Sequence, residues 1–287
     1  MSQHLKGLLI TVLGVFILSP DALLVRLVSS DTWTILFWRG LLFALGIFLI
    51  ILITYRSNTI KQFKLIGKRG ILLGFLFGLS TIFFVTGVQY TSIANALVII
   101  STSPVFAALL SWVFLKEKTS LRTWITMFII IAATSAIMFN SFKHGGFWGD
   151  MSALMTSILL AINFTITRQA KSINMIPAMA IAGLTTSAIA AIAICFTASP
   201  LYLEATVIPY LLLMGLVTTL AFSLITLGPR YMPAAEVGMI MPLETVFGAY
   251  LAWVFLSEAP SIHVIVGGSI IMLTLIIHAW FTVRAAS

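Results

Sequence analysis

Charged side chains are scarce throughout this chain. Asp, Glu, Lys and Arg together make up 8% of the 287 residues, whereas a soluble domain carries roughly 25%. So few charges cannot cover a surface that faces water, which excludes an ordinary soluble domain. Hydrophobic residues make up 60% of the chain and its mean hydropathy is +1.13. We therefore expect the whole chain to be a membrane domain.

Cysteine is nearly absent as well. The single Cys195 excludes an internal disulfide, and we interpret it as a small buried hydrophobic residue. The 4 histidines are scattered without the spacing of metal ligands, and no Gly-rich phosphate loop occurs. We accordingly expect no metal ion and no cofactor.

Long apolar stretches recur from one end of the chain to the other. Each is close to the ~20 residues that a helix needs to cross a hydrocarbon core of ~30 Å. The first follows Lys6 as a secretory signal would, but it lacks a small-residue cleavage site and contains Pro20 and Asp21. We interpret it as a retained helix, so the sequence predicts an all-α polytopic membrane protein. The ten predicted transmembrane helices cover residues 7–25, 33–54, 70–88, 93–115, 123–140, 150–167, 175–197, 207–227, 234–256 and 262–282.

The net charge of +8 does not indicate a nucleic-acid partner, because the basic residues interrupt the apolar stretches instead of clustering on a soluble face. With ten spans, nearly all of them fall on one side of the bilayer. By the positive-inside rule both termini are expected in the cytoplasm, with the protein in the inner (plasma) membrane. That side holds Lys6, Arg56, Lys61, Lys64, Lys68, Arg69, Lys116, Lys118, Arg122, Arg168, Lys171, Arg230 and Arg284, and the other holds Arg26 and Lys143.

The sequence repeats itself once. The motif WVFLKE at 112–117 recurs as WVFLSE at 253–258, and at the same offset Tyr90 falls on Tyr231 and Asn95 falls on Glu236. We expect two five-helix units, residues 1–143 and 144–287. Because five is odd, the second unit must enter the membrane in the opposite sense, which gives an inverted-topology repeat. The basic residues beside Glu117, absent beside Glu258, agree with opposite faces.

In the fourth helix of each half, a Pro precedes an aromatic-rich run that ends in Leu-x-Glu. These runs at 103–117 and 242–258, together with Gly149–Asp150 and Arg39, resemble the drug/metabolite transporter superfamily, specifically its EamA-type members. The two patterns differ in one respect: Pro242 lies earlier than Pro104 relative to the repeat offset. The two helices therefore need not break at equivalent depths.

This resemblance implies a secondary transporter that moves a small metabolite, an amino acid or a drug-like compound, by alternating access and more often by export. The alternatives are an uptake carrier, or a facilitator or channel. An intramembrane enzyme is less favoured, because the Gly-x-Ser-x-Gly nucleophile pattern is absent. The expected partners are a small-molecule substrate, the lipid bilayer and, if transport is coupled, protons. A monomer would suffice, because ten helices can close a cavity alone, but the sequence does not determine the oligomeric state.

Ionisable groups within membrane spans need a partner, a water-filled cavity or a function. Asp21 and Arg39 are predicted at similar depth in the first two helices, where they can neutralise each other. The pair either braces these helices or binds substrate. Glu244, beside the helix-breaking Pro242, is the strongest candidate for a substrate site. Because burial favours a neutral carboxyl, it can exchange a proton during transport, or it can remain protonated as a structural hydrogen-bonding group.

Four further polar residues are weaker candidates for substrate contact. Glu236 either caps a helix after Pro233 or lines a cavity end that matches the one at its repeat partner Asn95. Asn163 either contacts a ligand or links helices by a hydrogen bond. Tyr90 is an interfacial anchor or stacks on a substrate. Asp150 is interpreted as a helix cap.

Overall fold

All the regular secondary structure among the described residues is helical. The computed structural model describes residues 3–115, 121–143, 146–232 and 234–286, and no strand occurs among them. Eight helical segments there are long and apolar enough to cross a membrane, and two shorter apolar helices, Trp124–Asn140 and Ile262–His278, accompany them. The prediction of an all-α polytopic membrane protein with ten transmembrane helices is confirmed.

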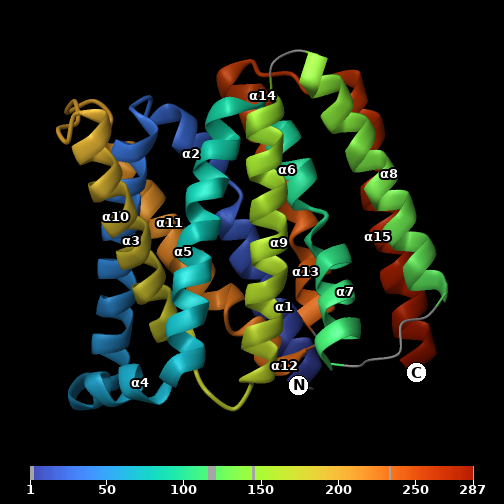
Figure 1. Cartoon of the computed structure of the whole chain (residues 1–287). Coiled ribbons are helices and arrows are strands. Elements are labelled where there is room, and N and C mark those ends of the chain that lie inside the picture. Colours follow the sequence, from blue (N-terminus) through green and yellow to red (C-terminus); the bar gives the residue numbers. More distant parts are fainter. Residues whose placement is uncertain (1–2, 116–120, 144–145, 233, 287) are drawn as a thin grey trace.

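The first half of the chain begins and ends on opposite faces of the bundle (Figure 1). Its helices are α1 (Gln3–Leu18), α2 (Asp21–Leu27), α3 (Thr32–Tyr55), the short η1 (Arg56–Asn58) and α4 (Thr59–Leu65), α5 (Gly67–Tyr90), α6 (Ile93–Ile100), α7 (Ser103–Leu115) and α8 (Leu121–Lys143). In this half, two of the predicted spans are each split into two helices: the first into α1 and α2, and the fourth into α6 and α7.

The second half starts on the face opposite to the N-terminus, so its helices run in the reverse sense (Figure 1). They are α9 (Phe147–Gln169), α10 (Ile176–Thr197), α11 (Ile208–Ile225), α12 (Gly228–Tyr231), α13 (Ala234–Ile240), α14 (Pro242–Leu256) and α15 (Ile262–Ala286). The two chain ends consequently lie on the same face. α7 ends on this face and α14 on the other, although Glu117 itself lies outside the described residues.

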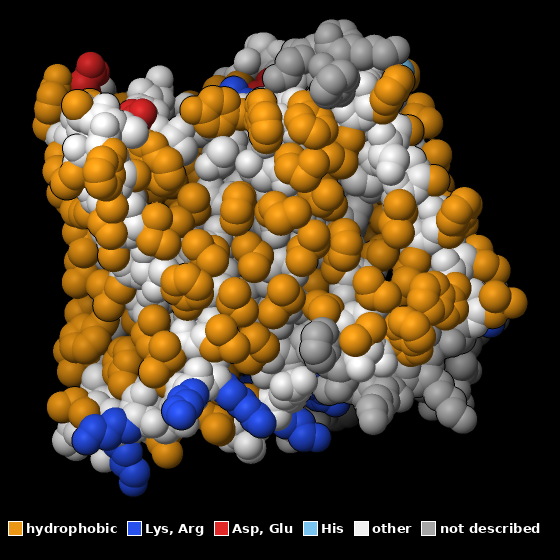
Figure 2. Space-filling model, in the orientation of Figure 1, with side chains coloured by type: hydrophobic (Ala, Val, Ile, Leu, Met, Phe, Trp, Pro, Cys, Tyr) orange, Lys and Arg blue, Asp and Glu red, His pale blue; other side chains and the backbone are white. Residues whose placement is uncertain are grey.

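The surface matches a protein embedded in lipid. Hydrophobic side chains cover most of the face seen in Figure 2, and Lys and Arg side chains gather along the edge that holds both termini. Residues such as Phe128 and Phe196 are largely exposed although they lie in the middle or near the end of a span. Cys195 is exposed too, so its interpretation as a buried residue was wrong: its helix is apolar on all sides, and hydrophobicity alone cannot separate lipid contact from core.

The fourth span of each half is broken near its middle. α6 ends at Ile100, and α13 ends at Ile240 immediately before Met241. At the repeat offset Ile100 falls on Met241, so the two breaks lie at nearly the same position even though the prolines do not. Pro104 and Pro242 both lie in the first turn of the following helix, where the missing N–H costs no hydrogen bond. The prolines can therefore differ in position while the breaks coincide.

Close helix contacts hold the halves together. A Cβ on Gly40 of α3 would lie 2.6 Å from the carbonyl oxygen of Gly183 in α10, so only glycine permits this approach. One large hydrophobic core joins most helices of both halves. A separate, smaller core lies between α8, α15 and the α6–α7 pair and includes Val98, Ile130 and Ile271. α8 and α15 thus form a flank beside the main bundle (Figure 1).

Candidate functional site

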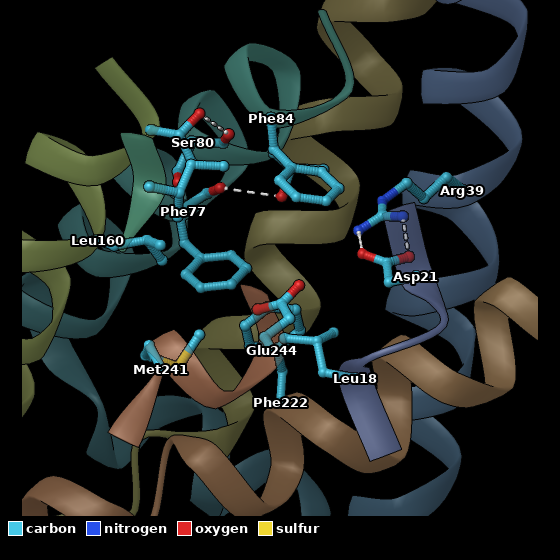
Figure 3. Close-up of a pocket in the computed structure, with 13 residues that line it drawn as sticks. Leu18, Asp21, Arg39, Phe77, Ser80, Phe84, Leu160, Phe222, Met241 and Glu244 are labelled. Carbon is cyan, nitrogen blue, oxygen red and sulfur yellow. Dashed lines mark hydrogen bonds and ion pairs between the residues drawn. The ribbon is translucent and has the colours of Figure 1, made fainter. Parts of the chain in front are cut away.

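A small hollow lies at the level of the broken helices. Its volume is about 30 Å³, room for about two water molecules. Helices of both halves contribute to its wall, and Figure 3 shows the side chains that point into it. The lining residues are Leu18, Asp21, Arg39, Phe77, Ser80, Thr81, Phe84, Ile100, Thr156, Leu160, Phe222, Met241 and Glu244.

Asp21 and Arg39 form a two-pronged ion pair on one side of this hollow. Arg39 Nη1 donates to Asp21 Oδ1 at 2.5 Å, and Nη2 donates to Oδ2 at 2.7 Å. Both side chains are at most 5% exposed. Pro20 ends the first helix segment, which lets Asp21 begin α2 at the depth where Arg39 lies on α3. The pairing that the sequence predicted is present, and it neutralises both charges.

Glu244 faces the same hollow from the other half of the chain. It lies in the first turn of α14, just after the break at Met241, and its carboxyl group points toward Asp21 and Arg39 (Figure 3). The charges of both residues act on it electrostatically. Among the residues that the structure describes, none donates a hydrogen bond to this carboxyl group. Glu244 is therefore a buried acidic group that is open to a proton or a ligand in the hollow.

Phenylalanine side chains form much of the remaining wall. The rings of Phe77 and Phe222 meet edge to face with centroids 4.7 Å apart. The guanidinium carbon of Arg39 lies 5.4 Å from the ring centre of Phe84, a cation–π contact. No sequence pattern distinguishes these three from the rest of the 21 phenylalanines of the chain. Only the tertiary structure, in which Phe77 and Phe84 of α5 and Phe222 of α11 line the same hollow, shows that they share one cavity.

Hydroxyl groups supply the other polar atoms of the wall. Thr156 Oγ1 in α9 donates to the carbonyl oxygen of Ser152 at 3.0 Å and lies 3.5 Å from that of Ser80 in α5. Ser80 and Thr81 also line the hollow. A ligand here would meet a charged pair, one carboxyl group, several hydroxyls and aromatic rings.

Asn95 lies in a different polar cluster, near the end of α5. Its side-chain nitrogen donates to Asp150 Oδ1 at 2.7 Å and to Thr91 Oγ1 at 3.2 Å. The interpretation of Asp150 as a cap was wrong, because α9 begins earlier and Gly146 is its N-cap. The Asp150 N–H already donates within the helix to Gly146, and its side chain is fully buried. This cluster joins the two halves at a distance from the hollow.

The other three candidates also lie outside the hollow. Glu236 is in the first turn of α13 and its Oε2 lies 2.6 Å from His4 Nε2, at the face of the termini. Tyr90 is 60% exposed at the end of α5. Asn163 is buried and donates to the carbonyl oxygen of Leu159 at 2.8 Å. Of the seven residues proposed from the sequence, the hollow gathers Asp21, Arg39 and Glu244.

The face opposite the termini is tied together by Arg26. Its Nε donates to the carbonyl oxygen of Val88 at 2.8 Å and its Nη2 to that of Thr91 at 2.6 Å. The same Nη2 lies 3.9 Å from Glu258 Oε1, which accepts a hydrogen bond from the N–H of Ile93 at 2.8 Å. Arg26 therefore links α2, the α5–α6 turn and the loop after α14 above the hollow. From the sequence, Arg26 was expected only to mark the side of the bilayer with few basic residues, and these contacts were not predicted.

Among the described residues, larger hollows that differ in character lie along α8 and α15. The largest, about 510 Å³, is bounded by α6, α14 and α15, and the others are about 420 and 200 Å³. The central hollow combines Asp21, Arg39 and Glu244, whereas the lining of the largest contains only hydroxyls as polar side chains. The central hollow is accordingly the candidate site despite its small volume.

The family model described as the EamA-like transporter family matches this chain twice, at residues 5–139 and 147–280. The chain belongs to the EamA-like transporter family. The two matches confirm a duplicated membrane protein of the drug/metabolite transporter type. No curated protein matches the chain. A solved structure described only as "Crystal structure of protein" is similar in fold, with a TM-score of 0.71 at 15% identity over 95% of this chain and 96% of that one.

Proposed function

We propose that this membrane transporter is a secondary carrier that moves a small polar or zwitterionic metabolite by alternating access. The observation that supports it most directly is the central hollow, where the Asp21–Arg39 pair and the carboxyl group of Glu244 face one another. A zwitterion such as an amino acid offers a carboxylate for Arg39 and an ammonium group for an acidic partner. Export is the direction that the family resemblance favours, and uptake is the alternative.

The size of the hollow supports a carrier over an open channel. Ligand sites for small molecules are roughly 300–1,000 Å³, about ten- to thirtyfold larger than the 30 Å³ found here. Substrate can therefore enter only after helices move apart. The helix breaks at 101–102 and at Met241 lie beside the hollow, and the Arg26 contacts are positioned to close the face opposite the termini. Rocking of one half against the other would open either face in turn.

Glu244 is the group through which protons would couple to transport. It is buried, lies beside a helix break and has no hydrogen-bond donor among the described residues. A proton bound there would neutralise the carboxyl group, and its release would restore a charge beside the Asp21–Arg39 pair. One charge that crosses a potential of ~100 mV supplies about 2.3 kcal/mol, roughly a fifty-fold concentration ratio.

A two-step experiment tests this proposal. Purified protein is first screened by thermal shift against amino acids and drug-like amines, and the best ligand is then followed in proteoliposomes. We expect flux that saturates, shows counterflow and is accelerated by an imposed proton gradient. Unitary currents across a planar bilayer would instead identify a channel, and saturable flux that ignores the gradient would identify a facilitator.

A further inference from the structure

A short helix outside the membrane spans was not expected from the sequence. α4 (Thr59–Leu65) joins α3 to α5 and runs along the face that holds both termini instead of crossing the bundle (Figure 1). The chain leaves α3 at Arg56, where a φ of 47° turns the backbone. Because α4 lies at the end of two membrane spans, its outer side is at the level of the lipid headgroups.

The outer side of α4 combines apolar and basic groups. Ile60 is 71% exposed and Leu65 is 50% exposed, and Lys61 and Lys64 are exposed beside them. Residues three and four apart neighbour one another on a helix, so these four side chains share one surface. Large apolar groups next to lysines are typical of helices that lie in a membrane interface, with the apolar groups in the acyl boundary and the amines among the headgroups.

The charge around α4 has a single sign. The segment 56–69 contains five basic residues, all exposed, and neither Asp nor Glu. Basic side chains are prominent along this edge of the molecule in Figure 2. Four or more basic residues next to a membrane span attract anionic lipids at about 1 kcal/mol each. The five are Arg56, Lys61, Lys64, Lys68 and Arg69; we refer to residues 56–69 as the basic platform.

The basic platform is fixed by contacts on its inner side. The Phe63 ring lies 6.3 Å from that of Phe48 in α3, and Thr59 is buried with its hydroxyl donating to the carbonyl oxygen of Arg56 at 2.7 Å. At the end of α3, the Tyr55 hydroxyl accepts a hydrogen bond from Asn174 at 3.2 Å. A lipid would therefore meet an arrangement that is already ordered, which lowers the entropic cost of binding.

We propose that the basic platform is a binding site for anionic phospholipids, with the lysines holding the headgroup phosphate and Ile60 and Leu65 entering the acyl region. The partner follows from charge complementarity and from the apolar groups, which a soluble anion would leave exposed. The platform connects α3, which carries Arg39, to α5, which carries Phe77 and Phe84. A bound lipid therefore fixes the ends of two helices that line the central hollow. This inference does not depend on the identity of the transported substrate.

The test is a lipid titration of the full-length protein after delipidation in a mild non-ionic detergent. Dioctanoyl phosphatidylglycerol and dioctanoyl phosphatidylcholine are compared by the rise in melting temperature. We expect preference for phosphatidylglycerol, weakened by added salt. The variant Lys61→Gln/Lys64→Gln should bind phosphatidylglycerol roughly 25-fold more weakly, from about 1 kcal/mol for each lysine. The control Lys6→Gln/Lys171→Gln removes two charges from the same face outside the basic platform and should bind as the wild type does.

A second variant separates lipid from a simple anion. Ile60→Ser/Leu65→Ser keeps every charge and should also weaken phosphatidylglycerol binding, because its apolar groups no longer enter the acyl region. Equal losses in the lysine variant and its control would overturn the proposal, since the effect would then belong to the whole basic face. Unchanged binding by the serine variant, or an equal melting-temperature rise with inorganic phosphate, would also overturn it.

Discussion

The two broken helix pairs, α6–α7 and α13–α14, share a design but carry different chemistry. At the repeat offset Ser103 falls on Glu244, each just beyond its break. Glu244 faces the central hollow, whereas Ser103 is fully buried and is not among the residues that line the hollow. The breaks place backbone of both halves around one cavity. The two halves therefore share the geometry of the break, and the second half alone carries a carboxyl group at this position.

The first half contributes a pair of opposite charges to the hollow instead of a single acidic group. Asp21 and Arg39 fall on Ile162 and Ala180 at the repeat offset, so the second half has no counterpart of the ion pair. One half thus contributes a neutralised pair, and the other contributes a single acidic group. Two halves with the same arrangement of helices thus present different side chains to the hollow.

Breaking the ion pair on one side should have the largest effect. Asp21→Asn leaves the Arg39 guanidinium buried without its counter-charge, which costs about 3–5 kcal/mol. The double variant Asp21→Ile/Arg39→Leu replaces the pair by apolar groups, as at Ile162, and should be far closer to the wild type. Thermal unfolding in detergent measures both. If the double variant were no more stable than Asp21→Asn, the ion pair would not be a structural contact that apolar packing can replace.

Removing the acid of the second half should abolish coupling without abolishing binding. In Glu244→Gln the amide cannot exchange a proton, so a proton gradient should no longer drive accumulation, a loss of up to roughly fifty-fold. Ser103→Ala changes the equivalent position of the first half and serves as the matched control, with coupling retained. Substrate accumulation in proteoliposomes at several pH values measures this. If the pH dependence survives in Glu244→Gln, the carrier of the proton is another group.

Replacing Arg39 by Lys separates a brace from a substrate clamp. The ammonium group keeps the charge but cannot make two parallel hydrogen bonds to a carboxylate. If Arg39 also grips substrate, the loss of one charge-assisted bond, about 1.5 kcal/mol, should lower flux about tenfold in a folded protein. Flux is compared at matched amounts of reconstituted protein. A variant that transports normally would leave Arg39 with the structural function alone.

The smallest effect is expected at a hydrogen bond that only one break possesses. Thr245 Oγ1 in α14 donates to the carbonyl oxygen of Leu97 in α6 at 3.0 Å, whereas the equivalent residue of the first half is Pro104, which has no side-chain donor. Thr245→Val should lower stability by about 1 kcal/mol. Melting temperature under the conditions used for the ion pair measures it. A shift as large as that of Asp21→Asn would mean that this bond supports more than the contact of the two helices.

Much of the fold was predictable from hydrophobicity and spacing. All ten predicted spans coincide with helices, because the bilayer requires about twenty apolar residues in each. The inverted repeat followed from the WVFL motif and an odd number of spans. α4 was not predicted, because its 7 residues mix apolar, polar and basic types and are too few to resemble a membrane span. The sequence also did not predict that the two breaks coincide. Proline is tolerated throughout the first turn of a helix, so the position of each proline does not fix where the preceding helix ends.

The site was predictable only in part. A charge within a span is costly, so Asp21, Arg39 and Glu244 stood out from their surroundings. The phenylalanine wall did not, because one apolar ring among many has no distinguishing pattern. The Asn95–Asp150 bond and the Arg26 contacts join residues that are at least 55 positions apart, and no local spacing encodes such partners.

The sequence was sufficient to predict that the chain is embedded in lipid, how many times it crosses the bilayer, and which ionisable groups lie within the membrane spans. These properties depend on the transfer of single segments from water to hydrocarbon, which each segment's own composition decides. Only the tertiary structure shows that Glu244 faces the Asp21–Arg39 pair across a small hollow. That arrangement depends on how helices of similar hydrophobicity pack against each other, and this is set by the shapes of side chains at contacts between distant parts of the chain.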